Sequence, residues 1–334
     1  MKKRIAIWDN LKFLLIILVV FGHYAQHVKY NSGVLQGLCT STYLFHMPLF
    51  IFVTGMFSKR TVNEKNVKKV LPYLTCYFAT TLILFITKAF LKWNLSFEIF
   101  GTGAMPWYLM SMFFMFLITM VIKDYKPQYV MALSLIIGVL VGFCKTDNPD
   151  LFTWMRTFIF YPFFYLGYTL DADWVEKVTN KLYLKISAVI FFIVINVLAF
   201  SFPKETGKLS KLFTARHTYD ELGKFANDGW IYRILVYALS FAAIFLLISL
   251  IPRKRIKGFT VYGERTLGIY MFHYVIIYIL VYTAKLPKLL EKALPFGWDV
   301  LFIPISILTA YLCANKVFDF ISRKLFSSDW KLKG

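Results

Sequence analysis

The chain has 334 residues, of which 58% are hydrophobic and 19% aromatic, and its net charge at pH 7 is +20. A soluble domain of this length does not need so much apolar material, and repeated long apolar stretches are typical of transmembrane helices. The four cysteines are isolated in apolar surroundings, which excludes a disulfide framework and a cysteine-based metal site. We expect these cysteines to be packing residues.

Taken in chain order, the apolar stretches predict an all-α integral membrane protein, a polytopic bundle of about ten transmembrane helices of the length that a bilayer requires. The first stretch has no convincing cleavage site after it, so we interpret it as a retained helix and not as a secretory signal. We expect one transmembrane domain over residues 1–334, with no appended soluble domain. The predicted helices span 8–28, 38–58, 70–91, 105–123, 129–145, 152–170, 184–202, 230–251, 264–284 and 298–318.

The positive charge follows the connections between these helices. If the N-terminus is cytoplasmic, the inner segments hold 22 basic residues and the outer segments hold 11. By the positive-inside rule, both termini are expected in the cytoplasm, and the charge indicates topology and contact with anionic lipids, not nucleic-acid binding. The longest connection, residues 201–229, is then outside. Its length fits a lid or binding loop and equally a solvated connector, in which His217 would be a surface residue.

Two ionisable residues lie within the first predicted helix. Lys12 and His23 are eleven positions apart, about three helical turns, so both lie on one face of the helix, roughly 16 Å apart along its axis. Ionisable groups within a membrane are costly and usually face a protein interior or a water-filled cavity. A lysine that reaches the interface and a structurally bonded histidine would explain this pair equally well.

Further polar residues lie in the later helices. His46 precedes Pro48 in the second helix, and its predicted depth matches that of His23, which favours a polar site that the two share. Arg156 lies near the outer end of the sixth helix, where an arginine can also simply reach the interface. His273 is a third histidine within a predicted span, for which one bond to a neighbouring helix would be a sufficient explanation.

Five motifs follow one another along the chain: Trp8-Asp9-Asn10-Leu11-Lys12 through Gly22-His23, Phe45-His46-Met47-Pro48-Leu49-Phe50 with Gly55, Trp107-Tyr108-Leu109, Arg156 with Pro162-Phe163-Phe164 and Leu166-Gly167, and Leu267-Gly268-Ile269-Tyr270 with His273. In this order they resemble the acyltransferase 3 family of integral membrane O-acyltransferases. Two departures are visible: the family usually has an arginine where this chain has Lys12, and many members carry an additional soluble domain. The similarity is therefore greatest to the short members that acetylate capsular or other exported polysaccharides.

The resemblance implies a plasma-membrane enzyme that transfers an acetyl group from cytoplasmic acetyl-CoA to a sugar hydroxyl of a polysaccharide or lipid-linked sugar. Acetyl-CoA would be the donor substrate, with no permanently bound cofactor and no metal. A neutral histidine can deprotonate a hydroxyl or accept the acetyl group itself, and cations can bind the CoA phosphates. The expected catalytic residues are His23 and His46, the expected acyl-CoA-binding residues are Lys12, Lys68, Lys69 and Arg265, and the residues expected to bind the acceptor, stabilise the oxyanion or serve as structural polar groups are Asp9, Trp107, Tyr108, Arg156 and His273.

Two other functions fit the composition. A transporter or flippase for a lipid-linked sugar would also bury ionisable groups near the middle of the membrane and contain helices broken at proline, as Pro48 and Pro162 suggest. We see no internal repeat, however, and the three histidine-containing helices differ in sequence. The third candidate is an inactive partner subunit of a polysaccharide assembly, in which the histidines would be dispensable.

Overall fold

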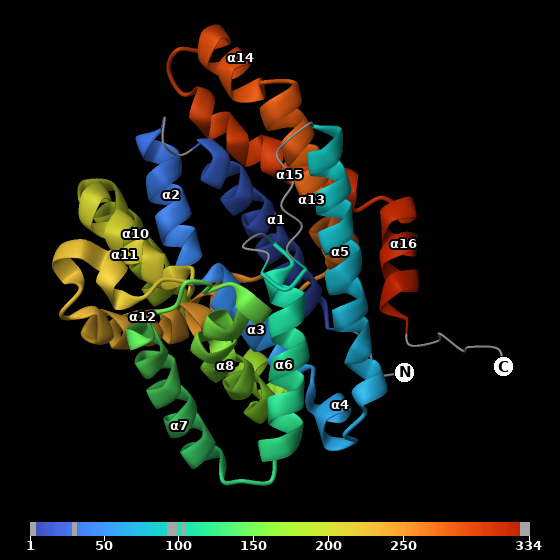
Figure 1. Cartoon of the computed structure of the whole chain (residues 1–334), viewed down its shortest axis with the longest axis vertical. Helices are drawn as coiled ribbons and strands as arrows, with labels where there is room; N and C mark the ends of the chain where they lie inside the picture. Colours follow the sequence, from blue (N-terminus) through green and yellow to red (C-terminus); the bar gives the residue numbers. More distant parts are fainter. Residues whose placement is uncertain (1–4, 29–31, 92–98, 102–104, 328–334) are drawn as a thin grey trace.

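The computed structural model describes residues 5–28, 32–91, 99–101 and 105–327. These residues form a helical bundle in which no strand occurs within the described ranges (Figure 1). The α-helices are α1 (Ala6–Val28), α2 (Gly33–Tyr43), α3 (His46–Met56), α4 (Lys59–Asn63), α5 (Leu71–Phe90), α6 (Trp107–Ile122), α7 (Pro127–Leu140), α8 (Trp154–Thr169), α9 (Ala172–Thr179), α10 (Leu182–Ser201), α11 (Pro203–Phe213), α12 (Gly229–Leu250), α13 (Thr266–Tyr278), α14 (Leu286–Ala293), α15 (Phe302–Cys313) and α16 (Lys316–Phe326).

The all-α membrane architecture predicted from composition is confirmed, whereas the number of spans is not. Within the described ranges, six helical segments are long and apolar enough to cross a membrane, or seven if the pair α15–α16, bent by 65°, is one span. Two of these six segments each combine two helical elements. Segment Gly33–Met56 contains α2 and α3, and segment Thr266–Thr283 contains α13 and the π-helical turn that follows it. Shorter apolar helices, α6, α7 and α8, occupy three of the other predicted positions.

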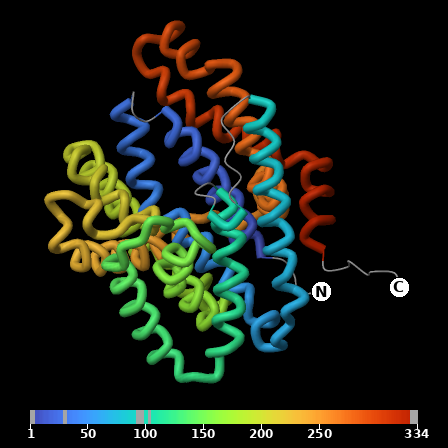
Figure 2. Tube along the Cα trace, viewed as in Figure 1, coloured from blue at the N-terminus to red at the C-terminus, as the bar shows by residue number. Residues whose placement is uncertain are grey.

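Helix α1 is central to the bundle, and α2, α13 and α15 pack around it (Figures 1 and 2). Its apolar side chains are buried on several faces, as expected for a membrane helix surrounded by others. The N-terminal part of α1 is anchored by Asn10, whose amide donates hydrogen bonds to the carbonyl oxygens of Pro252 (2.8 Å) and Lys254 (3.0 Å). Thr260 donates a third hydrogen bond to the Asn10 side-chain oxygen at 2.6 Å. The position of Lys12 and His23 within the bundle is therefore fixed from the first turn.

Helices α3 and α8 approach each other closely because glycine occupies the contact on both sides. A Cβ atom at Gly55 would collide with the backbone carbonyl of Phe164, and one at Gly167 would collide with that of Phe52. Small residues at such contacts let the backbones of membrane helices pack directly. This contact places His46, at the start of α3, and Arg156, in the first turn of α8, in the same part of the bundle.

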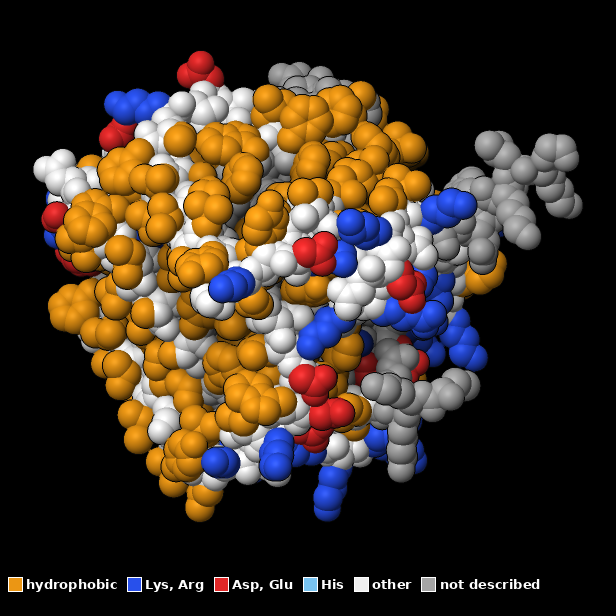
Figure 3. Space-filling model, turned by 90° about the horizontal axis from the view of Figure 1, so that it is seen from below, with side chains coloured by type: hydrophobic (Ala, Val, Ile, Leu, Met, Phe, Trp, Pro, Cys, Tyr) orange, Lys and Arg blue, Asp and Glu red, His pale blue; other side chains and the backbone are white. Residues whose placement is uncertain are grey.

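The outer surface of the bundle is largely apolar. Figure 3 shows hydrophobic side chains spread over much of the face in view, with Lys and Arg gathered toward one side. Helix α10 is the least buried of the candidate spans. The cysteine expectation holds for Cys39, Cys76 and Cys313, which are buried, but Cys144 is exposed because it follows the end of the α7 segment.

Candidate active site

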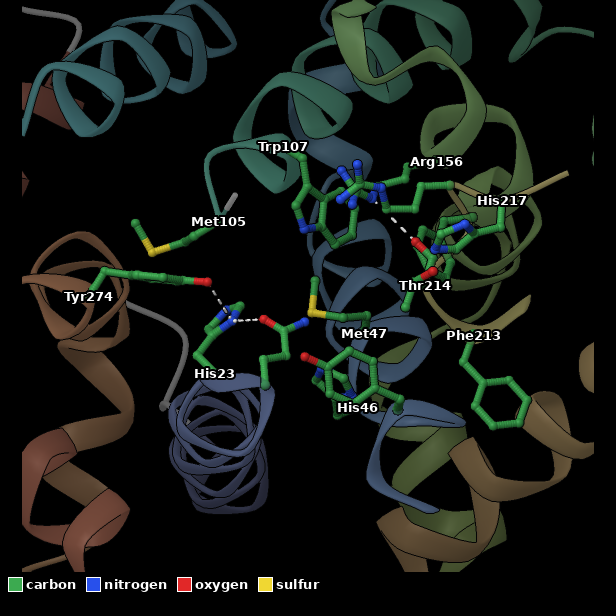
Figure 4. A pocket seen from close by; sticks show the side chains of 14 residues that line it. His23, His46, Met47, Met105, Trp107, Arg156, Phe213, Thr214, His217 and Tyr274 are labelled. Carbon is green, nitrogen blue, oxygen red and sulfur yellow. Dashed lines mark hydrogen bonds between the residues drawn. The ribbon is translucent and has the colours of Figure 1, made fainter. Parts of the chain in front are cut away.

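A cavity of about 350 Å³ lies where α1, α2, α3, α6, α8 and α13 meet the chain that follows α11. Figure 4 shows how its lining side chains converge. We call it the outer cavity, because it lies toward the predicted outer end of α1. Of the residues predicted from sequence, it is lined by His23, His46, Trp107 and Arg156.

His23 is held by two neighbours. Its Nδ1 atom lies 3.2 Å from Oε1 of Gln26 and 3.0 Å from the hydroxyl of Tyr274 (Figure 4). In the tautomer protonated on Nδ1, the ring donates to the Gln26 oxygen and Nε2 keeps its lone pair. The His23 ring also stacks on His273, with ring centroids 5.3 Å apart. A neutral imidazole with a free lone pair has the form that a general base or nucleophile requires.

His46 and His273 share one local arrangement. In each, Nδ1 donates to a backbone carbonyl one turn earlier: His46 to Thr42 at 2.8 Å and His273 to Ile269 at 2.9 Å. This fixes the tautomer, so that Nε2 of each neutral ring is an acceptor. Nε2 of His273 is buried and has no hydrogen-bond partner among the described residues. His46 lines the cavity, whereas His273 lies behind His23.

Arg156 is buried, and its interactions position the guanidinium at the cavity wall. It donates to the Asp150 carboxylate at 2.9 Å and to the Thr214 carbonyl at 3.2 Å, and it lies over the Trp107 ring, 5.0 Å from the centroid. Asp150 also forms an ion pair with Arg216. One buried carboxylate thus orients two arginines, so the cavity retains net positive charge and can hold an anionic or strongly polar group.

The long connection predicted between 201 and 229 is structured and contributes to the cavity. Helix α11 and the 3₁₀ segment Tyr219–Phe225 flank a turn in which Thr214, Arg216 and His217 line the cavity. His217, predicted to be a surface residue, has a side chain that is 27% exposed and also lines the cavity. Its Nδ1 atom lies 2.6 Å from Glu221, and partial burial lowers the pKa of His217 below its ordinary value, although Glu221 opposes this shift.

A second cavity, of about 440 Å³, lies toward the inner end of α1 and is called the inner cavity here. Lys12 and Lys69 line it. The Lys12 ammonium group forms an ion pair with Asp9 at 2.8 Å, and its side chain remains 24% exposed, so it is accessible to a ligand. Lys68 and Arg265 are not among the lining residues. Arg265 instead donates to the Ala314 carbonyl at 2.9 Å, so a role in CoA binding remains a prediction for both of these residues.

A thin wall separates the two cavities. Phe50 and Thr54 line the inner cavity, while Met47, one turn earlier on α3, lines the outer one. Tyr108 donates to Thr54 across a distance of 2.7 Å, and the hydroxyl of Tyr270 binds the carbonyl of Met105, which lines the outer cavity. Tyr108, predicted as an acceptor or oxyanion residue, therefore lies in the wall.

Four residues of the site are not predicted from the sequence: Gln26 and Tyr274 contact His23, Asp150 binds Arg156, and Arg216 binds Asp150. Gln26 follows His23 by three positions, a helical neighbour that spacing alone could have identified. Asp150 and Arg216 lie in loops. Asp150 precedes Arg156 by 6 residues and Arg216 follows it by 60, and no local sequence pattern pairs these positions. Among the described residues, no group of three or more His, Cys, Asp or Glu side chains could hold a metal ion.

Comparisons with known proteins agree with the motifs. The sequence profile of the acyltransferase domain matches residues 5–315. The chain is similar to the nodulation protein NolL of Sinorhizobium fredii, with 29% identity over 198 residues covering 52% of this chain and 50% of that protein. It is also similar to NolL of Mesorhizobium japonicum, with 28% identity over 145 residues and 38% of each chain covered.

The chain spans about half the length, or less, of these curated relatives. No solved structure matches it significantly. The domain profile nevertheless covers almost all of the helical bundle, including every predicted site residue, the outer cavity and all of the inner cavity's lining except Phe326. The chain therefore belongs to the acyltransferase 3 family of membrane proteins.

Proposed function

We propose that the protein is a plasma-membrane O-acetyltransferase that moves an acetyl group from cytoplasmic acetyl-CoA to a sugar hydroxyl of an exported or cell-surface polysaccharide. The observation that carries this proposal is the pair of cavities along α1. The inner cavity presents Lys12 and Lys69, and the outer cavity presents His23, His46 and Arg156. In the proposed orientation both termini are cytoplasmic, and the phosphates of CoA bind the lysines of the inner cavity.

His23 is the proposed base or acetyl carrier. In the direct route, Nε2 takes the proton of the sugar hydroxyl while its oxygen attacks the thioester carbon. The carbon–sulfur bond then breaks, and the proton passes to the departing CoA thiolate. In the relay route, Nε2 attacks the thioester carbon, the carbon–sulfur bond breaks, and the Nδ1 proton of His23 passes to the departing thiolate, which leaves a neutral acetylimidazole. The sugar hydroxyl then attacks the acetyl carbon, the bond from this carbon to Nε2 breaks, and the hydroxyl proton returns to the imidazole. His46 is proposed as the partner that exchanges the proton in either route.

Arg156 is proposed to stabilise the negative charge that develops on the thioester oxygen. A preoriented donor of this kind contributes without reorganising during the reaction. Asp150, the Thr214 carbonyl and the Trp107 ring hold the guanidinium in place, so its orientation does not depend on a ligand. The wall of Phe50, Thr54 and Tyr108 marks where the pantetheine arm would have to cross between the cavities.

The test compares purified His23→Ala with the natural chain and with His27→Ala. His27 lies one turn further along α1 and contacts Tyr282 at 2.7 Å, so it is a matched control outside the outer cavity. We expect His23→Ala to reduce polysaccharide acetate per repeat unit by about 10²-fold or more at equal protein level, because a positioned base contributes about that much. His27→Ala should remain close to normal.

Acetyl-CoA consumption provides the second measurement. Natural acetate content in cells producing only His23→Ala would overturn the catalytic role of His23. If neither the natural chain nor the variant consumes acetyl-CoA, while loss of the gene stops export of the sugar intermediate, the protein is a transporter and the proposed acetyl transfer is wrong.

A further inference from the structure

A third hollow, of about 160 Å³, opens on the side of the bundle between α2, α10, α11 and α12. We call it the lateral groove. Its lining is almost entirely apolar and includes Leu44, Leu198, Leu209, Leu235 and Leu239. Its volume is close to that of an engineered cavity of about 150 Å³ that binds benzene, so it can hold a short length of hydrocarbon.

The helices that flank the lateral groove expose apolar side chains. Helix α10 exposes a row of aliphatic side chains, including Ile190 and Ile193 at 57% each, and α12 exposes Ile234 at 48%. Such a face is stable only against lipid or another apolar partner. Leu198 and Leu235 belong to these exposed faces and also line the groove, so a chain from the lipid phase can enter without crossing polar surface.

The inner end of the lateral groove meets the outer cavity at Phe213. This residue, the last of α11, lines both hollows and lies at the edge of the cavity in Figure 4. The residues that follow it, Thr214 and Arg216, line the outer cavity, and Thr214 binds Arg156 through its carbonyl. The apolar groove therefore adjoins a cavity that holds two arginines and the histidines, with Phe213 shared between the two linings, which is an arrangement suited to an amphiphile with an anionic link between tail and sugar.

We propose that the lateral groove binds the hydrocarbon tail of a lipid-linked sugar, so that the acetyl acceptor is a glycolipid intermediate and not a finished polymer. The tail enters between α10 and α12, the phosphate that links it to the sugar meets Arg216, and the sugar hydroxyl reaches His23. This inference rests on the proposed acetyl transfer, but tail binding can be measured without it.

The binding test uses the full chain in nanodiscs of phosphatidylcholine and a photoreactive polyisoprenyl phosphate. We expect labelling of peptides from Ile195–Ala199 or Tyr232–Leu239, with competition by unlabelled polyisoprenyl phosphate and not by phosphatidylglycerol. We expect Leu235→Trp and Leu198→Trp each to fill the groove and to weaken labelling about tenfold. An effect of this size corresponds to the loss of apolar contacts to about two methylene groups of the tail. Ile190→Trp is the matched control, because Ile190 is exposed on α10 but does not line the groove.

The activity test compares a lipid-linked sugar with the same sugar as a short, water-soluble glycoside. Leu235→Trp should lose acetylation of the lipid-linked acceptor and keep that of the glycoside, whereas His23→Ala should lose both. Equal competition by phosphatidylglycerol, or equal labelling of Leu235→Trp and Ile190→Trp, would overturn the groove proposal. Specific labelling without acetylation of either acceptor would support the groove and overturn the acetyl transfer.

Discussion

The hydroxyl groups of Thr54 and Tyr108 lie 2.7 Å apart and join α3 to α6 at the wall between the two cavities. Thr54 donates its own proton to the Phe50 carbonyl at 3.0 Å, so Tyr108 is the donor to Thr54. We expect Tyr108→Phe and Thr54→Val each to destabilise the protein by about 0.6 kcal/mol, a typical value for hydrogen bonds between membrane helices.

The double variant should cost less than the sum of the two, because both changes remove the same bond. Reversible unfolding in mixed micelles measures all three free energies of unfolding. Strict additivity would show that the Thr54–Tyr108 contact contributes nothing to the stability of the wall.

Arg156 and Asp150 are both buried, so neither tolerates the loss of its partner. Asp150→Asn leaves two arginines without their carboxylate, and removing one member of a buried ion pair costs about 3–5 kcal/mol. Arg156→Lys keeps the positive charge, but a lysine ammonium lacks the planar guanidinium with which Arg156 binds both Asp150 and the Thr214 carbonyl. We expect the lysine variant to insert normally and to lose about tenfold or more in acetylation, measured as acetate per repeat unit at equal protein level.

Lys12 and Lys69 line the inner cavity, whereas the adjacent Lys68 does not, and this provides a matched pair of variants. Lys69→Ala should raise the KM for acetyl-CoA about tenfold, because the loss of one phosphate contact costs about 1.5 kcal/mol. Lys68→Ala should change this KM little. Lys12→Ala should resemble Lys69→Ala, and Lys12→Arg should retain much of the activity. Equal effects at positions 68 and 69 would argue against the inner cavity as the CoA site.

His46 and His273 differ in position although their hydrogen bonds are alike. Because His46 lines the outer cavity, we expect His46→Ala to reduce acetylation by a factor comparable with that of His23→Ala, about 10² or more. His273 supports the His23 ring from behind, so His273→Phe, which preserves a stacked ring, should keep more activity than His273→Ala. Equal loss in the two His273 variants would instead indicate that Nε2 of His273 takes part in proton transfer.

The proposed orientation places α11 outside the cell. A cysteine introduced at Lys208, which is exposed, should react with an impermeant maleimide in intact cells, in a background lacking the four native cysteines. A cysteine at Lys126, in the turn before α7, should react only after the membrane is opened. The reverse pattern would invert the topology and move the proposed CoA site to the wrong side.

The sequence predicted the apolar helices well because their length and composition are local properties. It predicted a site shared by His23 and His46 from their matching depth, and a role for Arg156 from the family motif, and all three line one cavity. It did not predict Asp150, which lies in the irregular turn before α8, or Arg216, which meets Asp150 only after two distant segments pack together. For the connection 201–229, a binding loop and a solvated connector fitted the sequence equally well, and its contribution to the cavity depends on tertiary packing.

The number of spans shows a different limit. An apolar stretch in the sequence does not show how long the helix within it will be. The helices α7 and α8 have only 14 and 16 residues, fewer than the roughly 20 that usually cross a bilayer. The break between α2 and α3 lies at Leu44 and Phe45, shortly before Pro48, whereas Pro162 lies inside the continuous helix α8.

The reciprocal glycine contacts of α3 and α8 have a consequence for motion. Because Gly55 and Gly167 seat each helix against the other's backbone, sliding or rotation of one helix would disturb a tight backbone contact. We therefore expect His46 and Arg156 to keep their spacing while substrates bind and leave. Rearrangements that admit the donor or release the product are then expected on the other side of the cavity, where α13 carries Tyr274 and the turn after α11 carries Arg216.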